Sequence, residues 1–382
     1  MKFSVLLPTR NGGHYLDSCI RSILEQNYSD LELIISDNAN TDQTPEVIRR
    51  FAGDPRVKAL RLESAVSVTE NWNNALSVAT GDYILMMGDD DYLLPRYFAK
   101  MVQLLDKYSH PDCVVYNAYS YIAPQSIGGN AQSLYGESHF RFGPDLTREG
   151  RLDAKQRFGI VHDMFRFRVR IPLNMQTTLV SRRASATIPG GAFQPPFPDH
   201  YALNSLLLSA AHWVVSPEKL LIVGVSPKSF GHYVYSNQQS TGLAYLGIDP
   251  NFTGRLPGNE LMNGMHIWLN LLKQHFPVEL RDITIDRAGY VRRQVYAWYV
   301  QKKLRTITAR ELVRNLGLLS GSDWLGLLSS GWDKESWRRL LRVANADRKN
   351  AAEAQWQGLQ HLDGIADIGQ FARWLASRET AP

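Results

Sequence analysis

The chain has 382 residues, of which 44% are hydrophobic and 21% are charged, and its formal net charge is +5. These values are ordinary for a globular protein with enough apolar material for one large domain or two. A basic balance favours anionic partners such as nucleotide phosphates or anionic lipid. The two cysteines, Cys19 and Cys113, form no CxxC pair, which argues against a disulfide-stapled fold and for a reducing compartment.

The first residues, "MKFSVLLPTRNGG", contain a short apolar stretch that breaks at Pro8 and turns polar. This is not the pattern of a secretory signal peptide, and no window approaches the ~18 uninterrupted apolar residues of a membrane span. The sequence therefore predicts a cytoplasmic protein, and it leaves open a peripheral position on the inner face of the membrane.

Strand and helix patterns alternate along the first part of the chain. Short apolar runs typical of buried strands are followed by segments with apolar residues at helical spacing. The predicted strands are residues 3–9, 31–37, 57–63, 82–91 and 113–119, and the predicted helices are residues 15–26, 44–52, 68–80 and 97–108. This alternation predicts an α/β fold with a doubly wound, mostly parallel sheet.

The patterns change after this alternating part. Residues 125–138 indicate a loop or hairpin, residues 157–184 a helix followed by a strand, and residues 213–227 another strand. A helix is expected to begin near Asp199, after a loop rich in glycine and proline. From about residue 250 onward the pattern is mostly helical.

Polar residues follow three of the predicted strands. Thr9 and Arg10 end the first strand, Asp37 and Asn38 the second, and the triplet Asp89–Asp91 the fourth. In parallel sheets, ligands bind beyond the carboxyl ends of the strands, where the connecting loops gather. The sequence therefore predicts one site built from three loops of the same sheet edge.

The triplet Asp89–Asp91 has two interpretations. It can be a solvated loop in which one aspartate caps the next helix. Alternatively, it can be part of a cation site, because Mg²⁺ and Mn²⁺ are typically held by one or two carboxylates together with substrate phosphates. Its place at the predicted sheet edge favours the cation site.

Three motifs, taken together, resemble those of the family-2 glycosyltransferases of the GT-A type. The motifs lie in "LLPTRNGGHYLDSCIRSILEQNYSDLELIISDNANTDQT" and, about forty residues later, in "ATGDYILMMGDDDYLLP". The resemblance is strong over residues 3–105 and weak as far as residue 235. It implies a nucleotide-sugar donor, a divalent metal ion and an inverting displacement at the sugar.

The first two loops carry the donor-binding positions that the resemblance implies. Pro8, Thr9 and Arg10 match positions that line the base and ribose, although Arg10 stands where a tyrosine is frequent. Asp37 matches an acid expected near the uracil or ribose, and Asn38 replaces a second acid. Because this amide can also pair with a pyrimidine edge, the match leaves the donor's identity open.

The resemblance also assigns roles within the aspartate triplet. Gly88 stands where many relatives have the first acid of the motif. Asp90 aligns as the best ligand for Mn²⁺ or Mg²⁺, Asp89 as a contact to the ribose or to metal-bound water, and Asp91 as either a ligand or a cap. Asp42, at the end of "DNANTD", is predicted to be a local turn or cap residue.

Asp199 is the predicted general base. An inverting transfer needs a group that takes the proton of the attacking acceptor hydroxyl. Relatives place an aspartate where a loop enters a helix, about one hundred residues after the metal motif, and "PPFPDHYALNSLLLSAA" offers Asp199 there. The alternative is that Asp199 only caps its helix.

The end of the resemblance departs from the family pattern. Relatives often have a histidine as an additional metal or phosphate contact where this chain has Ser226 in "VGVSPKSFGHYVYS". Lys228 and His232 lie nearby in sequence. Either residue could contact the donor diphosphate, although an exposed loop lysine usually points into solvent. We interpret Lys228 as a contact to the donor diphosphate and His232 as a further metal ligand.

The carboxyl-terminal region is basic. Between Arg287 and Lys349 there are fourteen lysines and arginines against five acidic residues. Residues 290–305 and 335–344 mix aromatic side chains with cations, so these helices either lie on anionic membrane or form ordinary surface packed on the catalytic domain. No pattern of a nucleic-acid-binding motif is present, and nucleic acid is not an expected partner.

The sequence thus predicts an inverting, metal-dependent glycosyltransferase, of the kind used in polysaccharide biosynthesis. It would move a sugar from a nucleoside diphosphate donor, expected to be UDP, to a hydroxyl of a glycan or lipid-linked acceptor. The predicted catalytic domain spans residues 1–240, with a nucleotide half (1–110) and an acceptor half (111–240), and a helical extension spans residues 241–382. A non-catalytic nucleotide- or glycan-binding relative and a nucleotidyltransferase are the alternatives.

Overall fold

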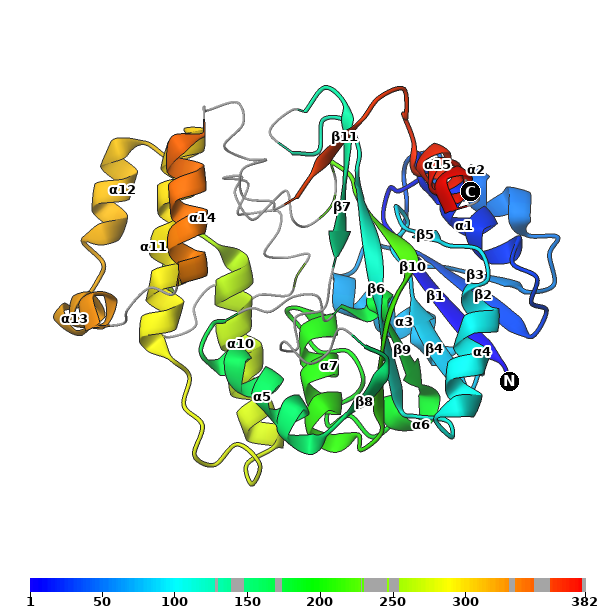
Figure 1. Cartoon of the computed structure of the whole chain (residues 1–382), viewed down its shortest axis with the longest axis horizontal. Helices are drawn as coiled ribbons and strands as arrows, with labels where there is room; N and C mark the ends of the chain where they lie inside the picture. Colours follow the sequence, from blue (N-terminus) through cyan, green and yellow to red (C-terminus); the bar gives the residue numbers. More distant parts are fainter. Residues whose placement is uncertain are drawn as a thin grey trace.

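The computed structural model describes the chain in nine stretches. They are residues 1–127, 130–138, 148–168, 174–227, 229, 246, 254–329, 334–346 and 358–379. The strands of these stretches form one mixed sheet with helices on both faces, and a group of helices lies at one end of the molecule (Figure 1). The predicted α/β class is confirmed.

The amino-terminal part forms a parallel half-sheet in the order β4–β1–β2–β3. Its strands and helices are β1 (Phe3–Thr9), α1 (Leu16–Leu24), β2 (Leu31–Asp37), α2 (Thr44–Phe51), β3 (Val57–Arg61), α3 (Val68–Ser77) and β4 (Tyr83–Met86). Each element lies within a predicted strand or helix. The fourth strand ends at Met86, so the aspartate triplet lies in the loop after it.

Both faces of this half-sheet are buried, because its central strands are apolar at nearly every position. On β1, Phe3, Val5 and Leu7 pack in the core beneath α1, α2 and α4 (Tyr97–Lys107). The intervening Leu6 faces the opposite core together with Ile34 of β2. A strand buried in this way fixes its register, because a slip of one residue would exchange the two faces.

The second half of the sheet is mixed. Its elements are β5 (Tyr92–Leu93), β6 (Cys113–Ile122), β7 (Ser133–Ser138), β8 (Gly150–Leu152), α5 (Ala154–Phe165), η1 (Met175–Thr177), β9 (Thr178–Ser181), α6 (Arg182–Ser185), α7 (Pro198–Ser209) and β10 (Trp213–Val225). Strand β9 runs antiparallel between β4 and β6 and joins the two halves. Strand β10 runs parallel to β6, while its other pairings, with β5 and β8, are antiparallel.

The helical region packs on the face of the sheet to which Leu6 and Ile34 belong. It contains α10 (Glu260–His275), α11 (Arg287–Leu304), α12 (Ala309–Leu316), α13 (Gly321–Ser329) and α14 (Lys334–Asn345). Helix α10 packs against α7, while α12, α13 and α14 lie at the end of the molecule farthest from β1, β2 and β3 (Figure 1). Within the described stretches, no helix combines the length and the apolar character that crossing a bilayer requires.

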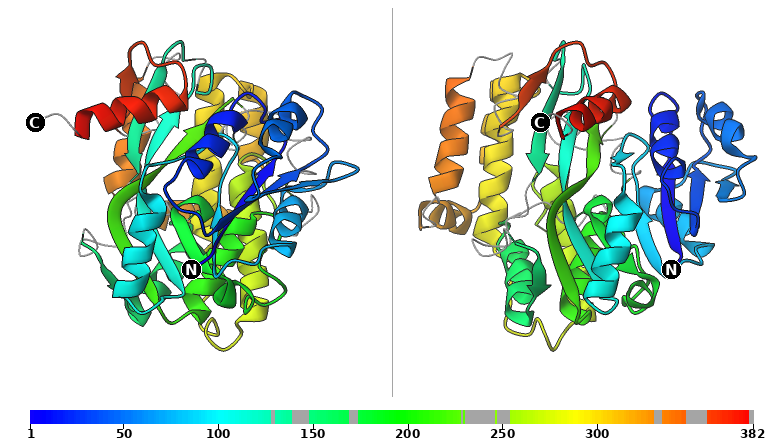
Figure 2. Two further views of the ribbon diagram at one scale, coloured as in Figure 1. Left: turned by 90° about the vertical axis from the view of Figure 1, so that its right-hand side faces the viewer. Right: turned by 45° about the vertical axis from the view of Figure 1, so that its right-hand side comes forward.

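The last described stretch returns to the sheet. Strand β11 (Gln360–Leu362) pairs antiparallel with β7, and α15 (Ile368–Glu379) packs near β5 and β10 (Figure 2). Phe371 of α15 is fully buried against Tyr121 and Tyr135. The sheet is therefore completed by residues that lie within the predicted helical extension.

Candidate active site

The carboxyl ends of β1 and β2 and the loop after β4 meet at one edge of the sheet. Thr9 and Asp37 are register partners at the ends of the first two strands. The hydroxyl of Thr9 donates to Oδ2 of Asp89 over 2.6 Å, and the carbonyl of Thr9 accepts from the amide of Asn38 over 3.1 Å. Thr9 therefore connects the Asp37 loop with the aspartate triplet, as the sequence predicts for a shared site.

Asp91 is built into the protein. Only 2% of its surface is exposed, and its two carboxylate oxygens accept the amides of Gly88 (2.6 Å) and Gly224 (2.9 Å). Burial, together with repulsion from Asp90, raises the pKa of the Asp91 carboxyl well above its usual range. Asp91 thereby joins the loop after β4 to the end of β10, and its role as a metal ligand stays a prediction.

Asp90 faces the end of β10. Its Oδ2 accepts a 2.8 Å hydrogen bond from the hydroxyl of Ser229. Burial raises the pKa of the Asp90 carboxyl, although hydrogen bonds from Ser229 and Ser226 oppose the rise. A Cβ on Gly224 would lie 1.8 Å from the carbonyl oxygen of Asp90, so the close approach of these two backbones requires glycine at this position.

Asp89 faces the opposite loop. In addition to the bond from Thr9, its carboxylate packs against Gly12, where an added Cβ would lie 1.9 Å from Oδ2. Among the residues that the structure describes, no three or more histidine, cysteine or acidic side chains are grouped to hold a metal ion. Carboxylates such as those of Asp89 and Asp90 are the ligands that a hard cation takes, one or two at a time, with phosphate oxygens and water completing its shell.

Asp37 forms an ion pair that the sequence analysis did not predict. Arg61, the last residue of β3, donates to Oδ2 of Asp37 over 2.6 Å, and the amide of Asn40 donates to Oδ1 over 2.8 Å. A second guanidinium nitrogen of Arg61 contacts the carbonyl of Asn40 at 3.3 Å. Asp37 and Arg61 are register partners in adjacent parallel strands, so the ion pair depends on a strand pairing that the sequence analysis did not predict.

Asn38 uses its side-chain amide within the protein. It donates to the carbonyl of Val66 (3.0 Å) and accepts the amide of the same residue (2.8 Å), which ties the loop before α3 to the site edge. Asp42 accepts the amide and hydroxyl of Thr44, as the predicted turn role requires, and it also accepts the amide of Gly13, in the loop after β1, over 3.2 Å. Pro8 is half-buried within β1, whereas Arg10 is exposed just beyond it.

Asp199 lies in the first turn of α7. The residue in the N-cap position is Phe197, and Asp199 follows Pro198 in the first turn, so Asp199 is not the N-cap residue itself although its carboxylate accepts a first-turn amide. Its carboxylate accepts the amide of the neighbouring His200 over 2.9 Å and is 20% exposed. The carboxylate therefore retains solvent access at the start of a buried helix.

The loop before α7 rests on α3. Asn73 donates its side-chain amide to the carbonyl of Phe193 over 3.1 Å, and Trp72 packs edge-on against the Phe193 ring. Asn74, on the same helix, donates to Ser36 of β2 over 2.8 Å. A continuous set of contacts therefore joins the segment that leads to Asp199 with the strands that carry Thr9 and Asp37.

Helix α10 packs against α7 where α7 begins. An added Cβ on Gly264 would lie 2.1 Å from the Phe197 ring, and Trp268 packs edge-on against His200. Glycine at 264 thus permits the two helices to approach closely where α7 begins.

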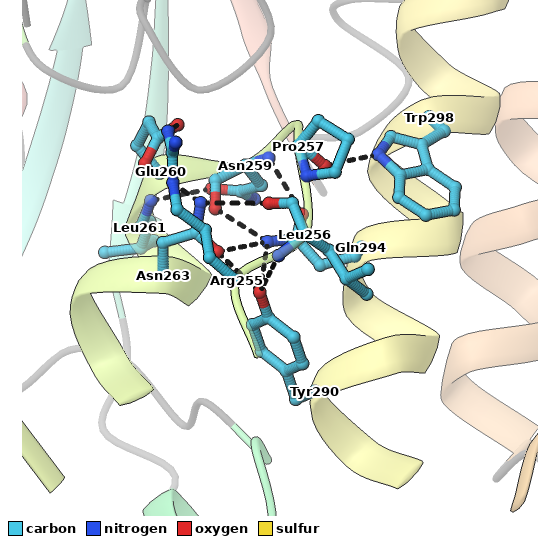
Figure 3. Close-up of polar contacts among 10 residues, drawn as sticks. All are labelled: Arg255, Leu256, Pro257, Asn259, Glu260, Leu261, Asn263, Tyr290, Gln294 and Trp298. Carbon is cyan, nitrogen blue, oxygen red and sulfur yellow. Dashed lines mark hydrogen bonds and ion pairs between the residues drawn. The ribbon is translucent and has the colours of Figure 1, made fainter. Parts of the chain in front are cut away.

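A buried polar network fixes α10 to α11 and to the loop between Arg255 and Asn259 (Figure 3). The Tyr290 hydroxyl accepts the amide of Leu256 and donates to Asn263, while Gln294 accepts the amide of Asn259 and donates to Asn263. The pairing of these buried polar groups favours one arrangement of the helices. The network therefore fixes the position of α10, the helix against which the start of α7, with Asp199, rests.

Two predicted site residues, Lys228 and His232, lie outside the described residues. The structure does describe Ser226, which precedes both, and Ser229, which lies between them in sequence. The amide of Ser226 donates to the hydroxyl of Ser229 over 2.8 Å, and Ser229 in turn contacts Asp90. Ser229 was not predicted as a site residue, because a serine in a loop carries no distinctive local pattern.

The fold and the position of this edge agree with what the glycosyltransferase resemblance implies. Residues 4–171, less than half of the chain, match the model of the family described as glycosyl transferase family 2. The resemblance found in the sequence is thereby confirmed.

Two curated relatives illustrate the sequence similarity. The glycosyltransferase GlyG of Streptococcus pneumoniae is 33% identical over 119 residues, which are 31% of this chain and 39% of that protein. The GalNAc(5)-diNAcBac-PP-undecaprenol beta-1,3-glucosyltransferase of Campylobacter jejuni is 34% identical over 112 residues, which are 28% of this chain and 36% of that protein. The matches thus span well under two thirds of these relatives' own lengths.

A solved structure extends the similarity of fold along the chain. The crystal structure of S. aureus TarS 1-349 in complex with UDP-GlcNAc aligns with 93% of this chain and 88% of that one, at 14% identity and a TM-score of 0.50. In sequence, the Staphylococcus aureus poly(ribitol-phosphate) beta-N-acetylglucosaminyltransferase TarS is 27% identical over 152 residues, 38% of this chain and 25% of that protein. The GT-A-type α/β fold with a helical carboxyl-terminal region is thus confirmed.

Proposed function

We propose that this protein transfers a sugar, with inversion, from a UDP-linked donor to a hydroxyl of a glycan or lipid-linked acceptor. The observation that carries the proposal is the hydrogen bond from Thr9 to Asp89, which joins the Asp37 loop and the aspartate triplet at one sheet edge. The choice of UDP is supported by TarS, whose crystal structure contains UDP-GlcNAc. The lipid-linked acceptor is supported by the undecaprenol-linked substrate named for the Campylobacter relative.

The donor's base and ribose would bind against the ends of β1 and β2. Asp37 offers carboxylate oxygens that can accept from a uracil N–H or a ribose hydroxyl, and Arg61 holds this carboxylate in place. Pro8, Thr9 and Arg10 would contact the same part of the donor from the end of β1. Both polar atoms of the Asn38 side chain are hydrogen-bonded to Val66. We therefore propose that Asn38 fixes the conformation of the loop and does not bind the base.

Asp89 and Asp90 would hold a Mn²⁺ or Mg²⁺ ion with the donor diphosphate. Their oxygen atoms suit a hard cation, and the burial of Asp90 favours a nearby positive charge. When bound, the cation neutralises charge that develops on the leaving diphosphate. Thr9 fixes the Asp89 carboxylate, and Ser229 fixes that of Asp90.

Asp199 would act as the general base. The acceptor oxygen forms a bond to the anomeric carbon while the bond from that carbon to the diphosphate breaks, and the hydroxyl proton passes to the Asp199 carboxylate. The released products are the glycosylated acceptor and UDP. Attack on the face opposite the leaving group inverts the configuration.

A donor screen tests this proposal. Thermal unfolding is measured with UDP-sugars, other nucleoside diphosphate sugars and nucleoside triphosphates, each with and without Mn²⁺. A donor at about one hundred times its Kd should stabilise the protein by about 2.7 kcal/mol. Absence of a shift with every UDP-sugar would contradict the UDP assignment.

Product analysis separates the alternatives. Release of UDP together with a glycosylated acceptor supports the transferase, whereas release of pyrophosphate would indicate a nucleotidyltransferase. Binding of the donor without turnover on any glycan or lipid-linked acceptor would indicate a non-catalytic relative.

A further inference from the structure

Helices α12 and α13 and the turn between them expose an unusual set of apolar side chains. The exposed fractions are 68% for Val313, 55% for Leu318, 44% for Trp324, 69% for Leu325 and 82% for Leu328. We call these five residues the α12–α13 surface. Helices α12 and α13 lie at the end of the molecule farthest from β1, β2 and β3 (Figure 1).

Helix α13 is held firmly with this face outward. Arg287 of α11 donates to the two oxygens of Asp323 over 2.9 and 3.1 Å, and Gly326 packs against Ala288. Asp323 is buried, and its pairing with Arg287 lowers the pKa of its carboxyl. The only charge on α13 is therefore neutralised on the inner side, and Trp324, Leu325 and Leu328 remain outside.

Helix α12 carries two exposed arginines, and its one acidic residue, Glu311, is bound to Thr308 at the helix start. Its inner side chains, Leu312 and Leu316, pack against the main core. Arg310, Val313 and Arg314 are exposed and, at spacings of three and four residues, share one side of the helix. The exposed side of α12 thus carries one aliphatic side chain, Val313, flanked by two arginines.

We propose that the α12–α13 surface docks on an anionic lipid bilayer, with its apolar side chains entering the headgroup region. A membrane fits better than a second copy of this chain for two reasons. A standard protein interface involves about 20–30 residues and ~800 Å² from each partner, far more than five side chains supply. In addition, the region from Arg287 to Lys349 carries fourteen cations against five acidic residues, which matches an anionic surface and would repel an identical one.

The surface differs from the one that the sequence pattern suggested. In α11, which corresponds to residues 290–305, Tyr296 and Tyr299 are half-buried, whereas Tyr290 and Trp298 are fully buried and Trp298 donates its indole N–H to Pro257. The rings of Tyr290 and Trp298 therefore cannot enter a membrane interface. A leucine pair and an indole on α13 take that place, and an indole is well suited to the headgroup level.

Docking at this end would bring the catalytic domain to a membrane that contains a lipid-linked acceptor. In this respect the inference extends the proposed function, but its test does not depend on transfer activity. The full-length protein is sedimented with vesicles of phosphatidylcholine alone and with vesicles of equal parts phosphatidylcholine and phosphatidylglycerol. We expect strong binding to the second kind only, and weaker binding as salt is raised.

Paired variants identify the surface. Replacement of Leu325 and Leu328 by aspartate (L325D/L328D) should lower binding to anionic vesicles by at least tenfold, since two leucines lose their burial. R310Q and R314Q should each lower it by about fivefold. V278D, which replaces an aliphatic side chain that is 70% exposed elsewhere, is the matched control and should bind like the unchanged protein.

Three results would overturn the proposal. They are equal binding by L325D/L328D and the unchanged protein, equal binding to neutral and anionic vesicles, or no vesicle binding at all. Sedimentation equilibrium gives a further check, because a dimer that L325D/L328D dissociates would make a second copy the occupant. Since all replaced side chains are exposed, unchanged thermal unfolding and donor binding should accompany the loss, and they separate it from failure of the proposed function.

Discussion

The Thr9 hydroxyl lies 2.6 Å from Oδ2 of Asp89, and this contact joins residues eighty positions apart at the edge of the sheet. Thr9 ends β1, while Asp89 lies in the loop after β4, the strand next to β1. The hydrogen bond therefore depends directly on the parallel pairing of β1 with β4. It leaves Asp89 oriented toward the β1 loop, whereas Asp90 turns toward Ser229.

Gly12 is required by the position of Asp89. In Gly12→Ala the added Cβ would lie 1.9 Å from Oδ2 of Asp89, so the carboxylate must move and the bond from Thr9 must break. We expect Gly12→Ala to fold but to bind a UDP-sugar with Mn²⁺ at least tenfold more weakly, since a charged hydrogen bond is worth about 1.5–3 kcal/mol. Isothermal titration calorimetry measures this change.

Gly53→Ala is the control for this prediction. An added Cβ at Gly53 meets no atom within 4 Å, so this variant should bind donor like the unchanged protein. Equal donor affinity in Gly12→Ala and Gly53→Ala would show that the orientation of Asp89 does not matter for donor binding.

Asp199→Asn tests the general base. The amide keeps the shape of the carboxylate and can still accept the His200 amide, but it cannot take a proton. We expect the transfer rate to fall by about 10²–10⁴-fold while donor affinity stays unchanged. Initial rates at saturating donor, together with calorimetry, separate the two quantities.

Asp153→Asn is the matched control for Asp199→Asn. Asp153 caps α5 through a hydrogen bond to the amide of Gln156, and asparagine caps a helix about equally well. The rate of this variant should be unchanged. An unaltered rate in Asp199→Asn would remove Asp199 from the mechanism.

The part of the site that the sequence predicted rests on local patterns. Apolar runs that end in polar residues identified β1, β2 and β4, and parallel strands place such ends at one edge. Thr9, Asp37 and Asp89 were accordingly predicted to share a site, and the contact between Thr9 and Asp89 agrees with that. The turn pattern around Asp42 likewise predicted its local hydrogen bonds with Thr44.

The parts that were missed depend on distant pairing. Arg61 reaches Asp37 only because β3 pairs with β2, and Ser229 reaches Asp90 from 139 residues away. Likewise, the pairing of Gln360–Leu362 with β7 crosses more than two hundred residues and leaves no local signal. Charge and periodicity describe a helix face, but only tertiary packing decides which of its aromatic residues are buried, as Trp298 shows.

Glu32 is predicted to make stability depend on acid pH. It is buried in β2 at the end of the sheet opposite the site and accepts hydrogen bonds from Lys58, Ser4 and the amide of Thr80. Burial alone would raise its pKa, but these donors together with Lys2 hold the pKa of Glu32 well below its usual value. Stability from a carboxyl with a lowered pKa is present above its unfolded pKa of about 4.3 and is lost as pH falls below it.

Glu32→Gln should therefore lower the free energy of unfolding by about 2–3 kcal/mol at pH 7, and by less as the pH approaches 3. Urea unfolding at several pH values measures the difference. Glu25→Gln, which removes an exposed ion pair with Arg21, should change stability by no more than about 1 kcal/mol at any of these pH values. A difference for Glu32→Gln that stays constant with pH would contradict the assignment of the pKa.

Phe371 is predicted to hold the last described stretch onto the catalytic sheet. Its ring is fully buried and stacks on the Tyr121 ring, with the ring centroids 5.7 Å apart. It also packs against the Tyr135 ring at a centroid distance of 5.2 Å. Truncation of a buried phenylalanine removes about 3–5 kcal/mol, which exceeds what the three residue pairs of β11 can retain. In Phe371→Ala, amides of α15 should therefore exchange with deuterium much faster, while those of β1 and β2 stay protected, because α15 detaches without unfolding the other core. Arg373→Ala, on the exposed side of the same helix, should leave exchange unchanged, and equal protection of α15 in both variants would show that Phe371 is not its anchor.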